Sequence, residues 1–192
     1  FTTTTEYKKL SHALSGKGAC ALFGLPASGR AQVYAALCRQ LDKPLCIVTP
    51  GEAEATRFAA DLNTLGIPAA VFPARDYVLR PIEGTAREYE YRRLAVLGEL
   101  VGGRLRAVAV PAEALTQFTT PKEDFCANTR TLHAGDTLLR DDLLAALFGA
   151  GYTRRAQVDG PGQFSVRGDI VDIFAPDQKM PVRMEFWGDE ID

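Results

Sequence analysis

The sequence has few of the features that identify zinc proteins, membrane proteins and secreted proteins. It holds four cysteines and two histidines, and no two cysteines have C-x-x-C spacing, so we expect no metal site. No apolar run is long enough to cross a bilayer, and the first residues carry no signal-peptide pattern. We therefore expect a cytoplasmic protein that needs no cofactor and binds no membrane. Cys20 and Cys46 lie in apolar runs and are expected to be buried, reduced thiols.

The chain also lacks an excess of positive charge. Its 22 Lys and Arg residues face 24 Asp and Glu residues, which gives a formal net charge of −2. Proteins that bind nucleic acids without sequence specificity usually carry a strongly basic surface, so the composition disfavours such a role. Local arginines remain, in the segment Arg75 to Arg93 and at Arg154 and Arg155. A DNA-binding module built on these arginines is one alternative function.

The first two thirds of the sequence alternate short apolar runs with helical patterns. We predict strands at residues 19–23, 45–49, 69–72 and 106–110, and helices at 6–14, 30–41, 52–65 and 85–101. Apolar strands separated by helices are typical of a parallel sheet that is covered on both faces. This pattern predicts an α/β domain over residues 1–128. Its last residues, 119–128, are polar, contain Pro121 and suit a linker.

The pattern changes in the remaining residues, 129–192. One amphipathic helix is predicted within residues 136–150. Its apolar stripe comprises Leu143, Leu144, Leu147 and Phe148. From Tyr152 onward, apolar residues recur at every second position and are interrupted by Gly, Pro and Asp residues typical of turns. We predict a small α+β module in which this helix packs on an antiparallel sheet.

A glycine-rich loop follows the first predicted strand and has the spacing of a P-loop, G-x-x-x-x-G-K-[ST]. The two glycines are Gly24 and Gly29, but Arg30 replaces the lysine that binds phosphate, and Ala31 replaces the hydroxyl residue that binds Mg²⁺. Pro26 removes a backbone N–H that a phosphate would use. No acidic Walker B strand accompanies the loop. We interpret the loop as degenerate and expect neither nucleotide hydrolysis nor catalytic residues in this chain.

Two predicted strands of the second module alternate apolar and charged residues. The apolar set is expected to face the helix, and it comprises Phe164, Val166, Val182, Met184 and Phe186. The other set is expected on the solvated face, and it comprises Ser165, Arg167, Arg183, Glu185 and Trp187. Arginine and tryptophan are enriched in binding hot spots, so this face is a candidate docking surface. An ordinary solvated face with a cross-strand Arg–Glu pair would explain the same pattern.

The second module also carries the motifs of a known family. Residues 162–192 resemble the signature G-x-F-x-V-R-G-D-[IV]-[VL]-[DE]-[IL]-F, followed by V-R-[IVM]-[ED]-F-[FW]-G-D-E-I. UvrB excision-repair helicases share this signature with the bacterial transcription-repair coupling factors (Mfd). Upstream, Pro73 to Asp76, Arg92-Arg93-Leu94 and Val110 to Ala112 follow the same family order. The coupling factors fit better, because the P-loop is broken and the stretch from Phe72 to Thr85 is too short for the DNA-clamping hairpin of UvrB.

The resemblance implies a fold and a function. It implies an ATPase-dead domain similar to UvrB domain 1a over residues 1–128, then a module similar to UvrB domain 2 that binds the damage-recognition protein UvrA. The chain is then a non-catalytic fragment that recruits UvrA in transcription-coupled nucleotide excision repair. In the parent protein we expect an ATP-dependent DNA translocase that also binds RNA polymerase and double-stranded DNA, with these parts beyond residue 192. A fragment of a UvrB-type ATPase or helicase is the enzymatic alternative.

The resemblance also implies which residues contact UvrA. The family positions correspond to Arg167 in V-R-G-D, to Arg183 and Glu185 in V-R-x-E, and to Arg154 at the start of the predicted sheet. UvrB usually has a further arginine two residues before that of V-R-G-D, and this chain has Ser165 there. We expect that departure either to weaken the interface or to shift this contact onto Arg155.

Overall fold

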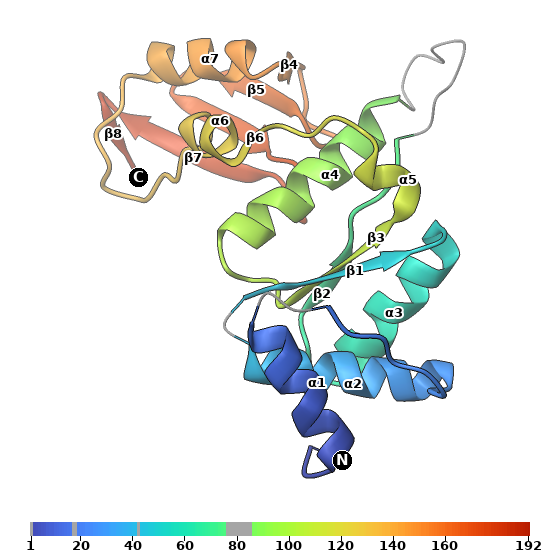
Figure 1. Ribbon diagram of the computed structural model, residues 1–192. Coiled ribbons are helices and arrows are strands. Elements are labelled where there is room, and N and C mark those ends of the chain that lie inside the picture. Colours follow the sequence, from blue (N-terminus) through green and yellow to red (C-terminus); the bar gives the residue numbers. More distant parts are fainter. Residues whose placement is uncertain (1, 17–18, 42, 76–85) are drawn as a thin grey trace. The chain divides into compact units, whose positions relative to one another are not determined.

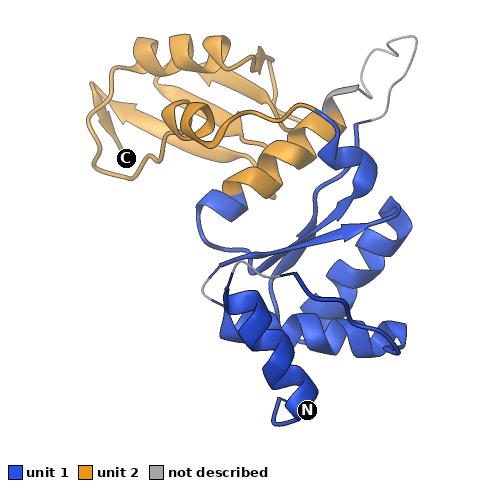
Figure 2. Cartoon of the chain, viewed as in Figure 1, with its two compact units in different colours: residues 1–77, 99–117 blue, residues 78–98, 118–192 orange. Residues whose placement is uncertain are grey.

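The computed structural model describes residues 2–16, 19–41, 43–75 and 86–192 (Figure 1). The chain divides into two compact units (Figure 2). Unit 1 comprises residues 1–77 and 99–117, and unit 2 comprises residues 78–98 and 118–192. Compact packing does not show which segments fold independently, so the division into domains at residue 128 stays a prediction.

Unit 1 is built on a three-stranded parallel sheet. Its strands are β1 (Leu45–Thr49), β2 (Ala69–Val71) and β3 (Ala107–Pro111), in the order β1-β3-β2. The central strand β3 is buried along its whole length, whereas Cys46 and Val48 of β1 are exposed. The prediction of a sheet covered on both faces therefore holds for β3 and is wrong for β1.

Three helices of unit 1 agree with their predicted positions to within a few residues. They are α1 (Thr5–Ser15), α2 (Ala27–Gln40) and α3 (Glu52–Thr64). The short α5 (Ala112–Leu115) was not predicted. The side chains of α2 and α3 meet those of the sheet in a core that includes Cys38, Ile47, Phe58 and Leu62. Helix α1 packs on α2 through Tyr7. Glu52 and Glu54 lie in the first turn of α3, where negative charge is favourable beside the helix dipole.

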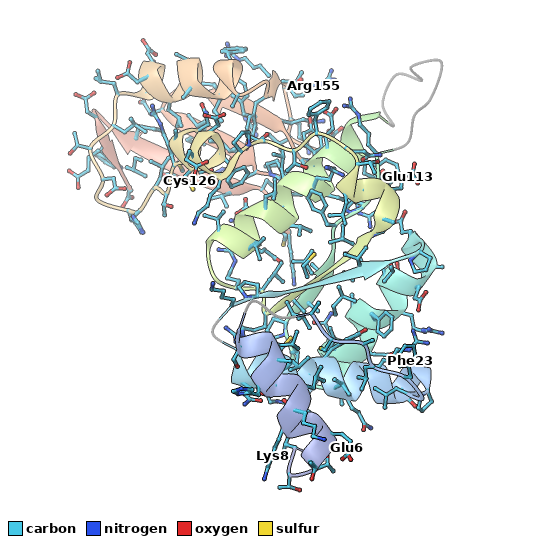
Figure 3. All side chains as sticks on the ribbon, in the orientation of Figure 1. Glu6, Lys8, Phe23, Glu113, Cys126 and Arg155 are labelled. Carbon is cyan, nitrogen blue, oxygen red and sulfur yellow. The ribbon has the colours of Figure 1, made fainter. Side chains whose placement is uncertain are left out.

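The strand predicted at residues 19–23 does not form. This stretch forms no strand, and the side chains of Leu22 and Phe23 are 49% and 87% exposed. Phe23 is labelled in Figure 3. Cys20 and Cys46 are both exposed, so the expectation that they are buried is wrong, while Cys38 is buried. An apolar run predicts a strand only where a neighbour is available to pair with it, and the sequence alone does not show that neighbour.

Unit 2 contains a five-stranded sheet in the order β4-β5-β6-β7-β8. The strands are β4 (Thr153–Arg154), β5 (Gln163–Arg167), β6 (Ile170–Phe174), β7 (Val182–Trp187) and β8 (Glu190–Ile191). Strands β5 to β8 pair in antiparallel fashion, as predicted, but β4 is parallel to β5. The prediction of a wholly antiparallel sheet is therefore wrong at β4.

Three helices belong wholly or mainly to unit 2. Helix α4 (Ala86–Val101) contributes its residues up to Gly98, and α7 (Arg140–Gly149) is the predicted amphipathic helix. Helix α6 (Lys122–Ala127) lies where we predicted a polar linker, so that prediction is wrong.

Helix α7 covers one face of the unit 2 sheet. Its Leu143 and Leu147 are buried in one cluster with Phe164, Val171 and Met184. The rings of Phe148 and Phe164 meet edge to face, with centroids 5.1 Å apart. Phe164 and Phe186 are 0% and 5% exposed, which confirms that both family aromatics belong to the core.

Candidate functional site

The sheet face opposite α7 carries polar residues in register across three strands. Ser165 on β5 is opposite Asp172 on β6, and Asp172 is opposite Arg183 on β7. In the next row, Arg167 is opposite Ile170, and Ile170 is opposite Glu185. Because side chains alternate along a strand, these two rows lie on the face away from α7. We call them the charged face.

Asp172 joins the two predicted arginines of the charged face. Its Oδ1 accepts a hydrogen bond from Nε of Arg183 at 2.7 Å, and its Oδ2 accepts one from Nη2 of Arg183 at 3.1 Å. The same Oδ2 accepts bonds from Nη2 of Arg167 at 3.0 Å and from the Ser165 hydroxyl at 3.2 Å. The arginine side chains are 60% and 55% exposed, whereas the Asp172 side chain is 12% exposed. A buried carboxylate therefore holds two solvated guanidinium groups.

The electrostatics of the cluster favour its charged form. The hydrogen bonds from Arg183 hold the pKa of Asp172 below its ordinary value, and the bonds from Arg167 and Ser165 lower it further, although burial opposes them. Asp172 in turn raises the pKa of Arg183 through the same hydrogen bonds and its negative charge. Asp172 is thus an ionised acceptor at neutral pH, and hydrogen bonds between ionised partners are the stronger kind.

A hollow of about 500 Å³ opens beside this cluster. Its charged wall consists of Arg167, Asp172 and Arg183, and its other wall of Gln157, Val158, Pro181 and Val182. Arg183 uses Nε and Nη2 on Asp172, and within the described part of the chain its Nη1 has no hydrogen-bond partner. The cluster can therefore donate further hydrogen bonds to an acidic or carbonyl group placed in the hollow.

The structure brings three of the five predicted contact residues onto one face and leaves two elsewhere. Glu185 is exposed on the charged face, and its charge contributes to the raised pKa of Arg183. Arg154 pairs in register with Phe164, so it lies on the α7 side of the sheet, at the edge strand. Arg155, labelled in Figure 3, lines a separate hollow with Tyr91 and Arg92 of α4.

Two features of the charged face differ from expectation. Ser165 was placed on the solvated side, but it is 1% exposed because it lies against Asp172. The alternative of an ordinary solvated face gave the arginines a glutamate as partner, whereas both arginines pair with Asp172. Sequence reasoning missed Asp172, although its place in Ile170-Val171-Asp172-Ile173-Phe174 puts it on the polar face by simple alternation.

The glycine-rich loop of unit 1 leads directly into α2. Pro26 is the N-cap residue of α2, so Gly29, Arg30 and Ala31 already lie within the helix. Arg30 reaches α3, where its Nη1 is 3.5 Å from Oε1 of Glu54 and its guanidinium carbon lies 5.9 Å from the ring centre of Phe58. Ala31 is buried in the core beside Ile47. The remaining loop glycine, Gly24, has φ +81°.

The arginine segment considered for DNA lies partly outside the described residues, which omit 76–85. Of its described members, Arg93 is 8% exposed and donates to the Thr119 hydroxyl at 2.8 Å. Arg92 lies over the Tyr89 ring, 5.9 Å from its centre. At least one of the basic residues in this segment is thus held inside the protein and not presented to a ligand.

The described residues offer neither a metal-binding cluster nor a membrane-spanning helix. Those residues contain no cluster of three or more His, Cys, Asp or Glu side chains arranged to hold a metal ion. Within the same ranges, no helix has the length and apolar character needed to cross a membrane.

Comparison with protein families identifies the second part of the chain. Residues 131–192 match the model of the UvrB interaction domain. This range includes α7, the whole five-stranded sheet and the charged face. The chain thus contains a region similar to the UvrB interaction domain.

Similarity to individual proteins extends over most of the chain. It is 39% identical to the transcription-repair-coupling factor of Mycobacterium bovis over 86% of this chain, and 30% identical to that of Bacillus subtilis over 89%. The UvrABC system protein B of Chlorobium limicola is 27% identical over 89% of this chain. The chain spans only 14% and 15% of the two coupling factors and 27% of the UvrB protein. The predicted resemblance to both groups is confirmed.

Proposed function

We propose that the charged face is a docking site for UvrA, and that the chain recruits UvrA in transcription-coupled nucleotide excision repair without catalysing a reaction itself. The observation that carries this proposal is the convergence of Arg167 and Arg183 on Asp172, inside the UvrB interaction domain. Guanidinium groups on a rigid sheet recognise acidic groups with defined geometry. Glu185 on the same face adds the opposite charge and so restricts which partner surfaces fit.

The same proposal gives unit 1 a supporting role. Its glycine-rich loop is a degenerate P-loop in which Arg30 serves the contact between α2 and α3, through Glu54 and Phe58, and does not hold a phosphate. The longer protein of which this chain would be a part is then an ATP-dependent DNA translocase that also binds RNA polymerase and double-stranded DNA. Catalysis would reside in that longer protein.

Titration of the chain with purified UvrA by calorimetry, without nucleotide, tests the docking site. We expect Arg167→Ala and Arg183→Ala each to weaken binding by about 2 kcal/mol, which is about 30-fold, since both lie at the centre of the proposed interface. Arg130→Ala is the matched control, because Arg130 is exposed and precedes the domain. Wild-type affinity in both folded test variants would contradict the site, and absence of binding by the wild type would contradict the function.

Nucleotide binding separates this proposal from the enzymatic alternative. The chain is expected to show no ATP binding in the same calorimeter up to millimolar nucleotide, because the loop offers neither the lysine nor the hydroxyl of a working P-loop. Saturable, Mg²⁺-dependent binding would instead favour a UvrB-type ATPase.

A further inference from the structure

The position of Asp172 raises a question about the charged face. If the arginines bind an acidic partner through charge alone, a carboxylate between them is unfavourable, because it cancels part of their attraction for that partner. Yet Asp172 is 8% exposed, occupies the central strand β6 and accepts four hydrogen bonds, three of them from the two arginines. A carboxylate with this placement requires a role of its own.

We propose that Asp172 is a positioning residue, which fixes the guanidinium groups of Arg167 and Arg183 in the geometry that the partner's acidic side chain requires. This inference rests on the proposed docking function and extends it to a residue that does not itself contact the partner. The ligand of the cluster is a carboxylate-bearing side chain that enters the hollow beside Val158 and Pro181.

The geometry of the Arg183 contact supports the proposal. Nε and Nη2 of Arg183 bind the two carboxylate oxygens at 2.7 and 3.1 Å, which is the paired arrangement that defines the guanidinium plane. Because these two bonds fix the guanidinium plane, they also fix the position of Nη1 relative to Asp172, and Arg183 is one of the residues that line the hollow. Arg167 shares a single bond with Oδ2 and is oriented relative to Arg183 through the same oxygen.

The surrounding structure fixes Asp172 in turn. Ser165 lies beneath the cluster at 1% exposure and donates to Oδ2, which leaves the carboxylate little freedom to rotate. The turn that follows Arg167 is held by Arg140 of α7, whose Nη1 donates to the Gly168 carbonyl at 3.0 Å and to Oδ1 of Asp169 at 3.1 Å. The end of β5 that carries Arg167 is therefore held by α7 as well as by the bond to Asp172.

Preorganisation explains why the carboxylate is useful despite its charge. The arginine side chains are 60% and 55% exposed, and an exposed arginine that is not held samples many rotamers, which it must give up on binding. Fixing them before the partner arrives removes that cost from the binding step. The two explanations then make opposite predictions when the Asp172 charge is removed.

The variant Asp172→Asn decides between positioning and attraction through charge alone. The measurement is its affinity for UvrA by calorimetry. If Asp172 positions the arginines, Asp172→Asn should weaken binding about tenfold, because Arg183 loses one of its two oxygen acceptors. This loss is expected even though the cluster becomes more positive. Asp189→Asn is the matched control, since it removes an exposed carboxylate of the same module. Affinity equal to or above that of the wild type in Asp172→Asn would overturn the inference and leave the docking site intact. No binding by the wild type would instead refute the docking function.

Two further measurements distinguish positioning from a general loss of structure. In the free chain, the Arg183 Nε–H resonance should be resolved and slow to exchange with solvent in wild type, and fast in Asp172→Asn, while backbone amide spectra of β5 and β7 remain native-like. In an Arg167→Ala/Arg183→Ala background, Asp172→Asn should no longer change the affinity. The inference would be contradicted if Asp172→Asn weakened binding just as much in the double-arginine variant as in wild type. Rapid exchange of the Arg183 Nε–H in wild type would also contradict it.

The variant Ser165→Ala is a second test of the positioning role, and it keeps the charge of Asp172. It removes one donor to Oδ2 and leaves every arginine bond in place, so we expect binding to weaken about two- to threefold. A loss as large as that of Asp172→Asn would mean that the packing of β5, and not the arginine geometry, governs affinity.

Discussion

The two units each contain an arginine paired with a carboxylate, and the two pairs differ in kind. In unit 1, Arg30 and Glu54 make one contact of 3.5 Å, with side chains 44% and 28% exposed. In unit 2, Arg183 makes two hydrogen bonds to Asp172, whose side chain is 12% exposed. An exposed single contact contributes little and restrains little, whereas a fork on a buried acceptor fixes a plane. The comparison shows what distinguishes an exposed ion pair from a pair that holds the guanidinium in a fixed orientation. The difference is the burial and geometry of the acceptor, and not the residue types.

The sheets differ in the same way. In unit 1, the exposed side chains of β1 are Cys46 and Val48, apolar groups with no polar partner to arrange. In unit 2, the exposed side chains of β7 include the charged Arg183 and Glu185, and register places Arg183 opposite the buried acceptor Asp172. A sheet becomes a recognition surface when polar residues on neighbouring strands fall in one row. The following experiments test whether substitutions in unit 2 cost more stability than comparable substitutions in unit 1.

The largest effect is expected from the core beneath the charged face. Phe164→Ala removes a ring that is 0% exposed and stacks on Phe148, so we expect the free energy of unfolding to fall by about 3–5 kcal/mol. Urea unfolding followed by circular dichroism measures it. Phe148→Ala, at 55% exposure, is the control and should cost about 1–2 kcal/mol. Equal losses for the two rings would show that α7 does not close the core as described.

A pair of glycines compares the two units at matched backbone conformation. Gly162 in unit 2 and Gly66 in unit 1 have φ of +73° and +74°. A Cβ on Gly66 meets nothing within 4 Å, whereas a Cβ on Gly162 would lie 2.5 Å from Cζ and 2.8 Å from Cε1 of Tyr91. We expect Gly66→Ala to cost about 1 kcal/mol, from backbone strain alone, and Gly162→Ala about 2–4 kcal/mol.

Thermal and urea unfolding of the two glycine variants give both numbers. Replacing Tyr91 by Ala in the Gly162→Ala background should reduce the difference, because it removes the ring that clashes. Equal costs at the two glycines would mean that α4 moves away from the strand without penalty.

The regular elements of unit 1 were predictable because their signals are local. Helix α3 has acidic residues in its first turn and Gly66 just beyond its end, and both boundaries agree with prediction. The strand predicted at residues 19–23 failed because strand formation depends on a distant partner. The short β4 was predicted with the wrong direction, since two residues carry no periodicity from which pairing follows.

The candidate site was predictable only in part. Alternation along β5 and β7 places Arg167, Arg183 and Glu185 on one face, and the structure agrees. Alternation along β6 also places Asp172 on this face, but its position between Ser165 and Arg183 follows only from the register between strands. Arg154 is the last residue of the short edge strand β4, and Arg155 follows that strand, so alternation along β5 and β7 does not place either of them.

Acid unfolding tests the paired hydrogen bonds between Arg183 and Asp172 without any binding partner present. The hydrogen bonds from Arg183 lower the pKa of folded Asp172 below the ordinary value of 3.8. A group whose pKa is lower in the folded state contributes stability above its unfolded pKa and loses it as the pH falls through the folded value. At neutral pH, the free energy of unfolding of the wild type should exceed that of Asp172→Asn by about 2 kcal/mol. This difference should shrink as the pH falls below about 4. Urea midpoints from pH 7 to pH 2 measure this, and a constant difference across that range would contradict the assignment.

The smallest effect is expected at the exposed pair of unit 1. Arg30→Ala should change the free energy of unfolding by about 0.5 kcal/mol, because its contact with Glu54 is long and solvated and the packing over the Phe58 ring is the larger part. Arg30→Lys keeps the charge, and the difference between the two variants isolates the value of that charge. Raising the salt concentration should narrow that difference further, since exposed pairs are screened. A loss of 2 kcal/mol or more in Arg30→Ala would remove the contrast between the units, because Arg30 would then be as firmly built into its surroundings as Arg183.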